Sequence, residues 1–199
     1  MNKFPNGAKR LNRDFYNRST LKVAKELLGK VLARQTPQGK ISGIITETEA
    51  YCGPRDLASH ASRGKTERTK TMFGLAGHLY IYLIYGMYYC LNIVTEKENY
   101  PAAVLIRSIQ PIEGINLMKK YRPKVKKENL ADGPGKLCLA FNLSKKQNSL
   151  DICNSKEIWV EENRDKIKLS QIIATPRVGV DYAGPYWSKK KWRFLMKNN

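Results

Sequence analysis

Two glutamates on a short predicted strand are the first residues that could do chemistry. In the segment ETEAY, residues 47–51, the side chains of an extended chain alternate, so Glu47, Glu49 and Tyr51 are expected on one face. A carboxylate held in a partly dry pocket can act as a general base. The same pattern also fits an exposed strand face with solvated acids, and periodicity alone does not decide which glutamate would be the base.

Two further polar residues lie beside apolar segments. His60 follows ETEAY closely and precedes a basic loop, and Arg107 ends the apolar strand AAVLIR. Each also fits an ordinary surface or packed position, and an arginine turned inward needs a carboxylate or a polar substrate to offset its burial. The acids, with Asp56 and His60, also allow a metal-dependent nuclease, although no cysteine–histidine spacing typical of zinc is present.

A tyrosine-rich segment, HLYIYLIYGMYYCLNIV at residues 78–94, indicates contact with flat ligands. Tyr80 and Tyr82 lie two apart, so on a regular strand they share a face and form a wall for stacking. Gly86 permits a tight turn, which places Tyr85 and Met87 at the tip of a hairpin. Large side chains at such a tip can wedge between base pairs. A central strand with its tyrosine hydroxyls reaching solvent remains an equal alternative.

The charge of the chain favours a polyanionic partner. The 199 residues hold 36 lysines and arginines against 17 aspartates and glutamates, a net charge of +19. An excess this large indicates nucleic acid first and an anionic membrane surface second. The basic residues gather near positions 63–70, 119–127 and 189–193, as expected of a surface that follows phosphates.

Composition also narrows the class of protein. The longest apolar run, residues 79–94, is shorter than the roughly 20 residues of a membrane span, and no signal-peptide pattern opens the chain. The four cysteines are widely spaced and are expected to be reduced thiols. We therefore expect a cytoplasmic protein that does not enter a membrane; the resemblance described below adds the expectation that it associates with DNA.

The helices and strands expected from the sequence would position these residues in a single α+β domain. We predict this domain over residues 15–199, after a flexible arm at 1–14. The domain is expected to hold a mixed, largely antiparallel curved sheet, surrounding helices and a protruding β-hairpin. Helices are predicted at 18–30, after Pro111, and at 133–143, and a long loop at 52–78. Strands are predicted at 30–36, 39–51, 79–95, 101–109, 157–162, 172–180 and 192–196.

Six segments in order carry a family resemblance. They are ETEAY, SHASRGKTERTKTMF, GHLYIYLIYGMYYCLNIVTE, AAVLIRSIQPIEG, GPGKLCLAF and RVGV. Together they resemble the alkyladenine DNA glycosylases, also called 3-methyladenine or methylpurine glycosylases, from about residue 14 to the C-terminus. ETEAY alone is a weak match, whereas the tyrosine-rich run with its Tyr-Gly-Met-Tyr turn is highly specific.

The resemblance implies a role for each candidate residue. It makes Glu49 the general base that activates a water, with Arg107 helping to hold the water and the carboxylate. Tyr51, His60 and Tyr82 would sandwich the extruded base, and Asn92 would disfavour the amino group of guanine. Tyr85 would fill the gap in the duplex, Met87 would lean on the opposite strand, and the backbone around Val178 would lend a carbonyl to the water.

The implied function is that of a base-excision-repair enzyme. It would flip alkylated or deaminated purines (the 3-methyladenine, 7-methylguanine, hypoxanthine and ethenoadenine class) out of duplex DNA and hydrolyse the N-glycosidic bond, leaving an abasic site. We expect a monomeric, monofunctional hydrolase without metal or cofactor. A non-catalytic nucleic-acid-binding protein and the metal-dependent nuclease remain the alternatives.

Overall fold

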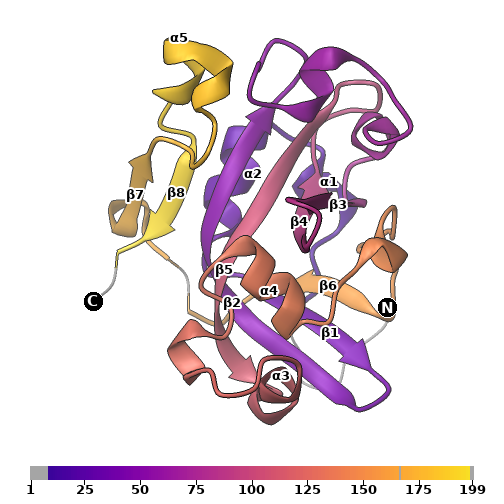
Figure 1. Cartoon of the computed structure of the whole chain (residues 1–199), viewed down its shortest axis with the longest axis vertical. Coiled ribbons are helices and arrows are strands. Elements are labelled where there is room, and N and C mark those ends of the chain that lie inside the picture. The colour runs from indigo at the N-terminus through magenta and orange to yellow at the C-terminus, as the bar shows by residue number, and fades with distance from the viewer. Residues whose placement is uncertain (1–8, 166, 198–199) are drawn as a thin grey trace.

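The computed structural model describes residues 9–165 and 167–197, and its frame is one curled antiparallel sheet (Figure 1). The strands are β1 Val31–Thr36, β2 Gly39–Cys52, β3 Leu79–Ile84, β4 Tyr88–Val94, β5 Ala102–Glu113, β6 Ile158–Glu161, β7 Ile172–Thr175 and β8 Arg193–Met196. Their order is β3-β4-β5-β2-β1-β6, with β8 paired to β2 and β7 paired to β8. The predicted α+β class is confirmed, and the pairs between these strands are all antiparallel.

Short helices surround the sheet. The α-helices are α1 Arg13–Tyr16, α2 Thr20–Leu27, α3 Ile115–Tyr121, α4 Pro134–Ala140 and α5 Gly184–Ser188. In Figure 1, α3 lies at the lower end of the molecule and α4 crosses the middle of the view, whereas α5 lies at the upper end, above β7 and β8. The 52–78 excursion is a long loop, as predicted, with two 3-10 helices, η1 His60–Arg63 and η2 Lys70–Phe73. No helix of the described chain is long and apolar enough to cross a membrane.

The long strand β2 changes its partner halfway along. Residues 39–44 pair with β1, and residues 47–49 pair with β8. On its other edge, β2 pairs with β5 from Ser42 to Cys52. Irregularities of register at Ser42/Gly43 and around Glu47 bend the strand between the two halves. The sheet therefore curls where the second half of β2 begins, and Glu49 lies inside this curl.

Two predictions of local structure need correction. The helix expected after Pro111 begins only at Ile115, because β5 continues through Pro111 to Glu113. Pro111 lies at the Ser42/Gly43 irregularity, where a residue without an N–H is tolerated in a sheet. The strand expected over 172–180 ends at Thr175, and the residues after Pro176 form a loop that approaches β2.

The predicted arm, residues 1–14, lies largely outside the described residues. Its described end packs on the domain. The N–H of Leu11 donates to the carbonyl of Val160 at 2.9 Å, and Arg10 forms an isolated antiparallel β-bridge with Glu161. The helix α1 begins at Arg13. Leu11 is buried in the main core.

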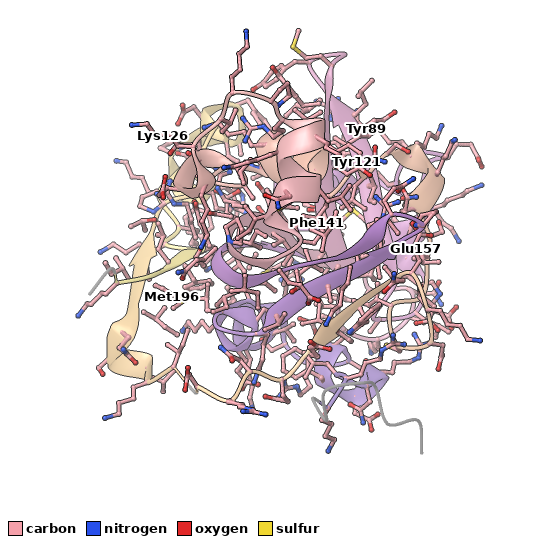
Figure 2. All side chains as sticks on the ribbon, turned by 90° about the horizontal axis from the view of Figure 1, so that it is seen from below. Tyr89, Tyr121, Lys126, Phe141, Glu157 and Met196 are labelled. Atoms are coloured by element: carbon pink, nitrogen blue, oxygen red, sulfur yellow. The ribbon has the colours of Figure 1, made fainter. Side chains whose placement is uncertain are left out.

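One large core and two small apolar clusters hold the fold. The large core lies between the sheet and α2 and α4; Figure 2 shows Phe141 in the interior and Lys126 at the periphery. One small cluster, built around Met72 and Tyr80, packs against Tyr82. The other, which contains Ala58 and Val180, packs against Tyr51. The two small clusters support opposite sides of the site described next.

Candidate active site

The carboxylate of Glu49 is buried but surrounded by hydrogen-bond donors. Tyr51 Oη donates to its Oε2 at 2.8 Å, and the Val178 N–H donates to its Oε1 at 2.8 Å. Arg107 Nη1 lies 3.3 Å from the same Oε1. The side chain is fully buried from bulk solvent, yet it lines a cavity of about 850 Å³. A charged group buried in this way is tolerated because its oxygens are paired.

The first glutamate of ETEAY, Glu47, has a different environment. Glu47 Oε1 accepts from Arg107 Nε at 2.7 Å and lies 3.2 Å from Arg193 Nε. It is not among the residues that line the cavity. Arg107 therefore bridges the two glutamates, which confirms that they share a face of β2. The intervening Thr48 points the other way, with Oγ1 donating to the carbonyl of Ala24 in α2.

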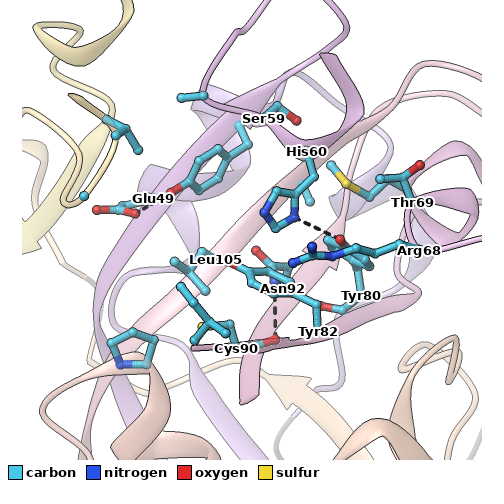
Figure 3. Close-up of a pocket in the computed structure, with 18 of the residues that line it drawn as sticks. Glu49, Ser59, His60, Arg68, Thr69, Tyr80, Tyr82, Cys90, Asn92 and Leu105 are labelled. Atoms are coloured by element: carbon cyan, nitrogen blue, oxygen red, sulfur yellow. Dashed lines mark hydrogen bonds between the residues drawn. The ribbon is translucent and has the colours of Figure 1, made fainter. Parts of the chain in front are cut away.

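Aromatic rings line the cavity on both sides (Figure 3). Tyr82 and His60 form one wall, with ring centroids 4.5 Å apart and an interplanar angle of 76°. Tyr51 also lines the cavity, and the Arg177 guanidinium covers its ring at 4.8 Å from the centroid. Burial, with a smaller effect of the Glu49 charge, raises the pKa of Tyr51 well above its ordinary value. The hydroxyl therefore keeps the proton that it donates to Glu49.

A hydrogen bond to Tyr80 holds the His60 ring in place in its wall of the cavity. His60 Nδ1 lies 3.0 Å from Tyr80 Oη, and the Tyr80 and Tyr82 rings lie 5.3 Å apart, which confirms their shared face. Burial, followed by the charges of Arg68 and Arg63, lowers the pKa of His60 to about 4. The imidazole is therefore neutral at pH 7.

Asn92 is held in one orientation at the cavity. Its Nδ2 donates to the carbonyl oxygens of Tyr80 at 3.0 Å and Cys90 at 3.4 Å, as Figure 3 shows for the latter. The side chain is 3% exposed. An amide tied by its nitrogen to the main chain offers a fixed chemical group to whatever enters the cavity.

A buried ion pair anchors the loop that brings Val178 to Glu49. Arg177 and Asp56 form two contacts, of 2.5 Å and 2.8 Å, and neither side chain is exposed. Arg177 also donates to the carbonyl of Ala50 on β2 at 2.9 Å. Asp56 is therefore committed to Arg177, whereas the nuclease alternative requires it beside Glu47, Glu49 and His60. Within the described residues, no group of three or more acids, histidines or cysteines is arranged to hold a metal ion.

The hairpin tip stands exposed at the rim of the cavity. Tyr85 is 81% exposed and lines the rim, and Met87 is 64% exposed but lies outside the cavity. The turn is tight: Tyr85 has φ +53°, Gly86 has φ +70°, and the Met87 N–H donates to the Ile84 carbonyl. The left-handed region is unusual for a bulky residue, so the turn holds Tyr85 at a cost in backbone energy. The hairpin is confirmed, and the single central strand is not formed.

A close contact between Gly135 and Tyr88 places the hairpin beside α4. A Cβ added to Gly135 would lie 3.0 Å from Cβ of Tyr88, tighter than an ordinary contact, so the glycine suits the close approach of the helix to the first residue of β4. Pro134 and Gly135 consequently line the cavity.

Most of the residues singled out in the sequence meet at this one cavity. It is lined by Glu49, Tyr51, His60, Tyr82, Tyr85, Asn92, Arg107 and Val178. Sequence reasoning missed Arg177 altogether and treated Arg68 only as one member of a basic cluster. The pairing of Arg177 with a residue 121 positions away has no local signal.

An aromatic-walled cavity with a buried carboxylate, beside an exposed aromatic tip in a strongly basic chain, is the arrangement expected of a DNA glycosylase. Comparison with known proteins agrees. The model of the methylpurine-DNA glycosylase family matches residues 14–199, so the chain belongs to this family.

Similar proteins come from archaea and bacteria. A protein of Methanocella arvoryzae named "Putative 3-methyladenine DNA glycosylase" is 54% identical over 190 residues, covering 95% of this chain and 93% of its own length. Proteins of the same name from Alkaliphilus oremlandii and Clostridium perfringens strain 13 are 47% and 46% identical. Each covers 96% of this chain, and the matches span 96% and 97% of their own lengths.

Proposed function

We propose that this protein flips alkylated or deaminated purines out of duplex DNA and hydrolyses their N-glycosidic bond. The observation that carries the proposal is the position of Glu49, buried at a cavity of aromatic walls with donors on both carboxylate oxygens. A base cannot be excised while it is stacked in the duplex, so such an enzyme needs a pocket outside the helix. The cavity volume of about 850 Å³ suits a small-molecule-sized guest such as a nucleotide.

The aromatic side chains offset the cost of extruding the base. Unstacking costs a few kcal/mol, and each stacking contact with an aromatic ring returns about 1–3 kcal/mol. Tyr51 would lie on one side of the base, with His60 and Tyr82 on the other. Tyr85, strained and exposed, adds nothing to the core of the free protein, which supports a role in the gap left in the duplex.

In the proposed reaction, Glu49 takes a proton from water as the oxygen attacks the anomeric carbon of the sugar. The bond to the base breaks, and its electron pair leaves with the base. Arg107 holds the carboxylate from one side, and the Val178 N–H holds it from another. The predicted contact of the Val178 carbonyl with the water stays a prediction, because the present contact uses its N–H.

The lesion itself supplies part of the driving force. A purine alkylated on a ring nitrogen is already a cation and a good leaving group. A neutral lesion such as hypoxanthine also needs a proton, and we assign no residue to that step. Among the described residues that line the cavity there is no lysine, which supports hydrolysis by water rather than a lyase step through a Schiff base.

We further propose that the enzyme acts as a monomer on duplex DNA. The net charge of +19 supports binding through phosphates, which positions the protein but carries little sequence information. That property suits an enzyme that searches for damage.

The test uses duplexes that each carry one defined lesion: 3-methyladenine, 7-methylguanine, hypoxanthine or ethenoadenine. The protein is incubated with each duplex in EDTA, and strand breaks are scored before and after alkali. The proposal expects breaks only after alkali, on at least one lesion. Direct breaks that EDTA abolishes would establish the nuclease, and tight binding with no break on any lesion would establish a binding protein.

A further inference from the structure

His60 is held in the cavity by a polar contact that the proposed chemistry leaves unexplained. Its Nδ1 lies 3.0 Å from Tyr80 Oη, and among the described residues this is the hydrogen bond that the Tyr80 hydroxyl forms. The Arg68 guanidinium carbon lies 5.3 Å from the centre of the Tyr82 ring. In Figure 3, the other ring nitrogen of His60 points away from Tyr80, toward the side of the cavity where Glu49 lies.

The direction of this hydrogen bond follows from what the buried phenol can reach. Tyr80 is only 2% exposed, and His60 Nδ1 is the hydrogen-bond partner of its hydroxyl among the described residues. The one hydrogen of the phenol is therefore donated to His60 Nδ1. A neutral imidazole that accepts on Nδ1 carries its hydrogen on Nε2.

The opposite direction leaves a buried group unpaired. If His60 Nδ1 carried the hydrogen, it would donate to the Tyr80 oxygen. The phenol hydrogen would then need another acceptor in a residue that is only 2% exposed. An unpaired polar hydrogen at such a position is unfavourable. The neutral state that burial and two arginines impose on His60 is consistent with the first arrangement.

We propose that Tyr80 is a positioning residue that fixes His60 as its Nε2–H tautomer, a hydrogen-bond donor for an acceptor atom of the nucleotide in the cavity. The nature of that ligand rests on the proposed function. The tautomer does not, because it is a property of the free protein.

The second histidine provides an internal reference. His78 Nδ1 lies 2.9 Å from the carbonyl oxygen of Leu75, which can only accept, so His78 carries its hydrogen on Nδ1. The chain has two histidines. One spectrum of the free protein should therefore show two opposite tautomers.

The test is long-range ¹H–¹⁵N NMR of the full chain labelled with ¹⁵N-histidine, at pH 7. We expect the wild type to show His60 as Nε2–H, and Tyr80→Phe to shift it toward a mixture of tautomers. Tyr121→Phe is the matched control away from His60 and should leave the spectrum unchanged. His60 found as Nδ1–H in the wild type, or unchanged in Tyr80→Phe, would overturn the proposal.

A second measurement addresses the donor role. In a Glu49→Gln background, which stops turnover, Tyr80→Phe should weaken binding to a hypoxanthine duplex about tenfold relative to an undamaged duplex. Unchanged selectivity despite a changed tautomer would overturn that role. If the wild type excises no lesion, the proposed function fails, while the NMR result still decides the tautomer.

Discussion

Replacement of Glu49 by glutamine tests the proposed chemistry with a minimal change of shape. The amide oxygen can keep the contacts with the Val178 N–H and Arg107 Nη1, at 2.8 Å and 3.3 Å in the wild type. The amide nitrogen then faces the Tyr51 hydroxyl, which can rotate and accept. The fold should therefore survive, at a cost of about 1–3 kcal/mol of unfolding free energy if one group is left imperfectly paired.

The catalytic loss should be much larger than the structural one. An amide cannot take the proton of the attacking water, and a positioned general base contributes about 10²–10⁴-fold to a rate. That factor corresponds to about 3–5 kcal/mol in the activation barrier. Single-turnover excision from a lesion duplex in EDTA, scored as breaks after alkali, measures the rate. Equilibrium binding to the same duplex should remain near that of the wild type.

Glu47→Gln is the matched control. It makes the same substitution on the same face of β2, where Glu47 contacts Arg107 and Arg193 but does not line the cavity. We expect a loss of at most about tenfold, through a less firmly held Arg107. An excision rate of Glu49→Gln within about threefold of the wild type would refute the reasoning. A greater loss in Glu47→Gln than in Glu49→Gln would refute it equally.

The remaining predictions address the hairpin, the histidine, the buried ion pair and the charge. Tyr85→Ala should weaken binding to a lesion duplex more than to an undamaged one, because stacking in the gap is worth about 1–3 kcal/mol; equal losses in competition assays would argue against a wedge. His60 is neutral in the fold and has its pKa lowered to about 4. The stability that its neutral form contributes is thus complete above about pH 6.5 and is lost as the pH falls toward 4. The unfolding free energy, measured with urea, should fall more steeply in this pH window for the wild type than for His60→Gln. The difference in slope should be at most about 1.4 kcal/mol per pH unit. Asp56→Ala leaves the Arg177 charge buried without its partner, so unfolding free energy should fall by about 3–5 kcal/mol; a loss below about 1 kcal/mol would contradict the burial of this pair. The logarithm of the DNA association constant should fall linearly with the logarithm of salt concentration, by about 0.9 per phosphate contacted; a flat dependence would contradict phosphate binding.

Features that depend on neighbouring residues were predictable from the sequence. The alternation in ETEAY correctly placed Glu47 and Glu49 on one face, as their shared contact with Arg107 shows. The glycine between Tyr85 and Met87 correctly indicated a hairpin tip. Both signals arise from backbone geometry over a few residues, so they do not require knowledge of the rest of the fold.

Long segments with two plausible structures were predicted less well. Apolar residues around Pro111 fit the start of a helix as readily as a strand. Pairing with β2, whose register is irregular at this point, makes the segment part of β5. Residues 176–180 looked like a strand continuation, but the ion pair of Arg177 with Asp56 pulls them into a loop.

The sequence by itself determined the strong positive charge and the α+β class, and its resemblance to a known family indicated Glu49 as the base and eight of the residues that line the cavity. Only the tertiary structure showed how the Glu49 carboxylate is held, by Tyr51, Arg107 and the Val178 N–H, and that Tyr80 stands behind His60. The physical reason is the distance along the chain: Glu49 meets Val178 across 129 positions, through a curled sheet and a buried ion pair. Local propensities carry no information about such a contact, because it exists only once the core has closed around it.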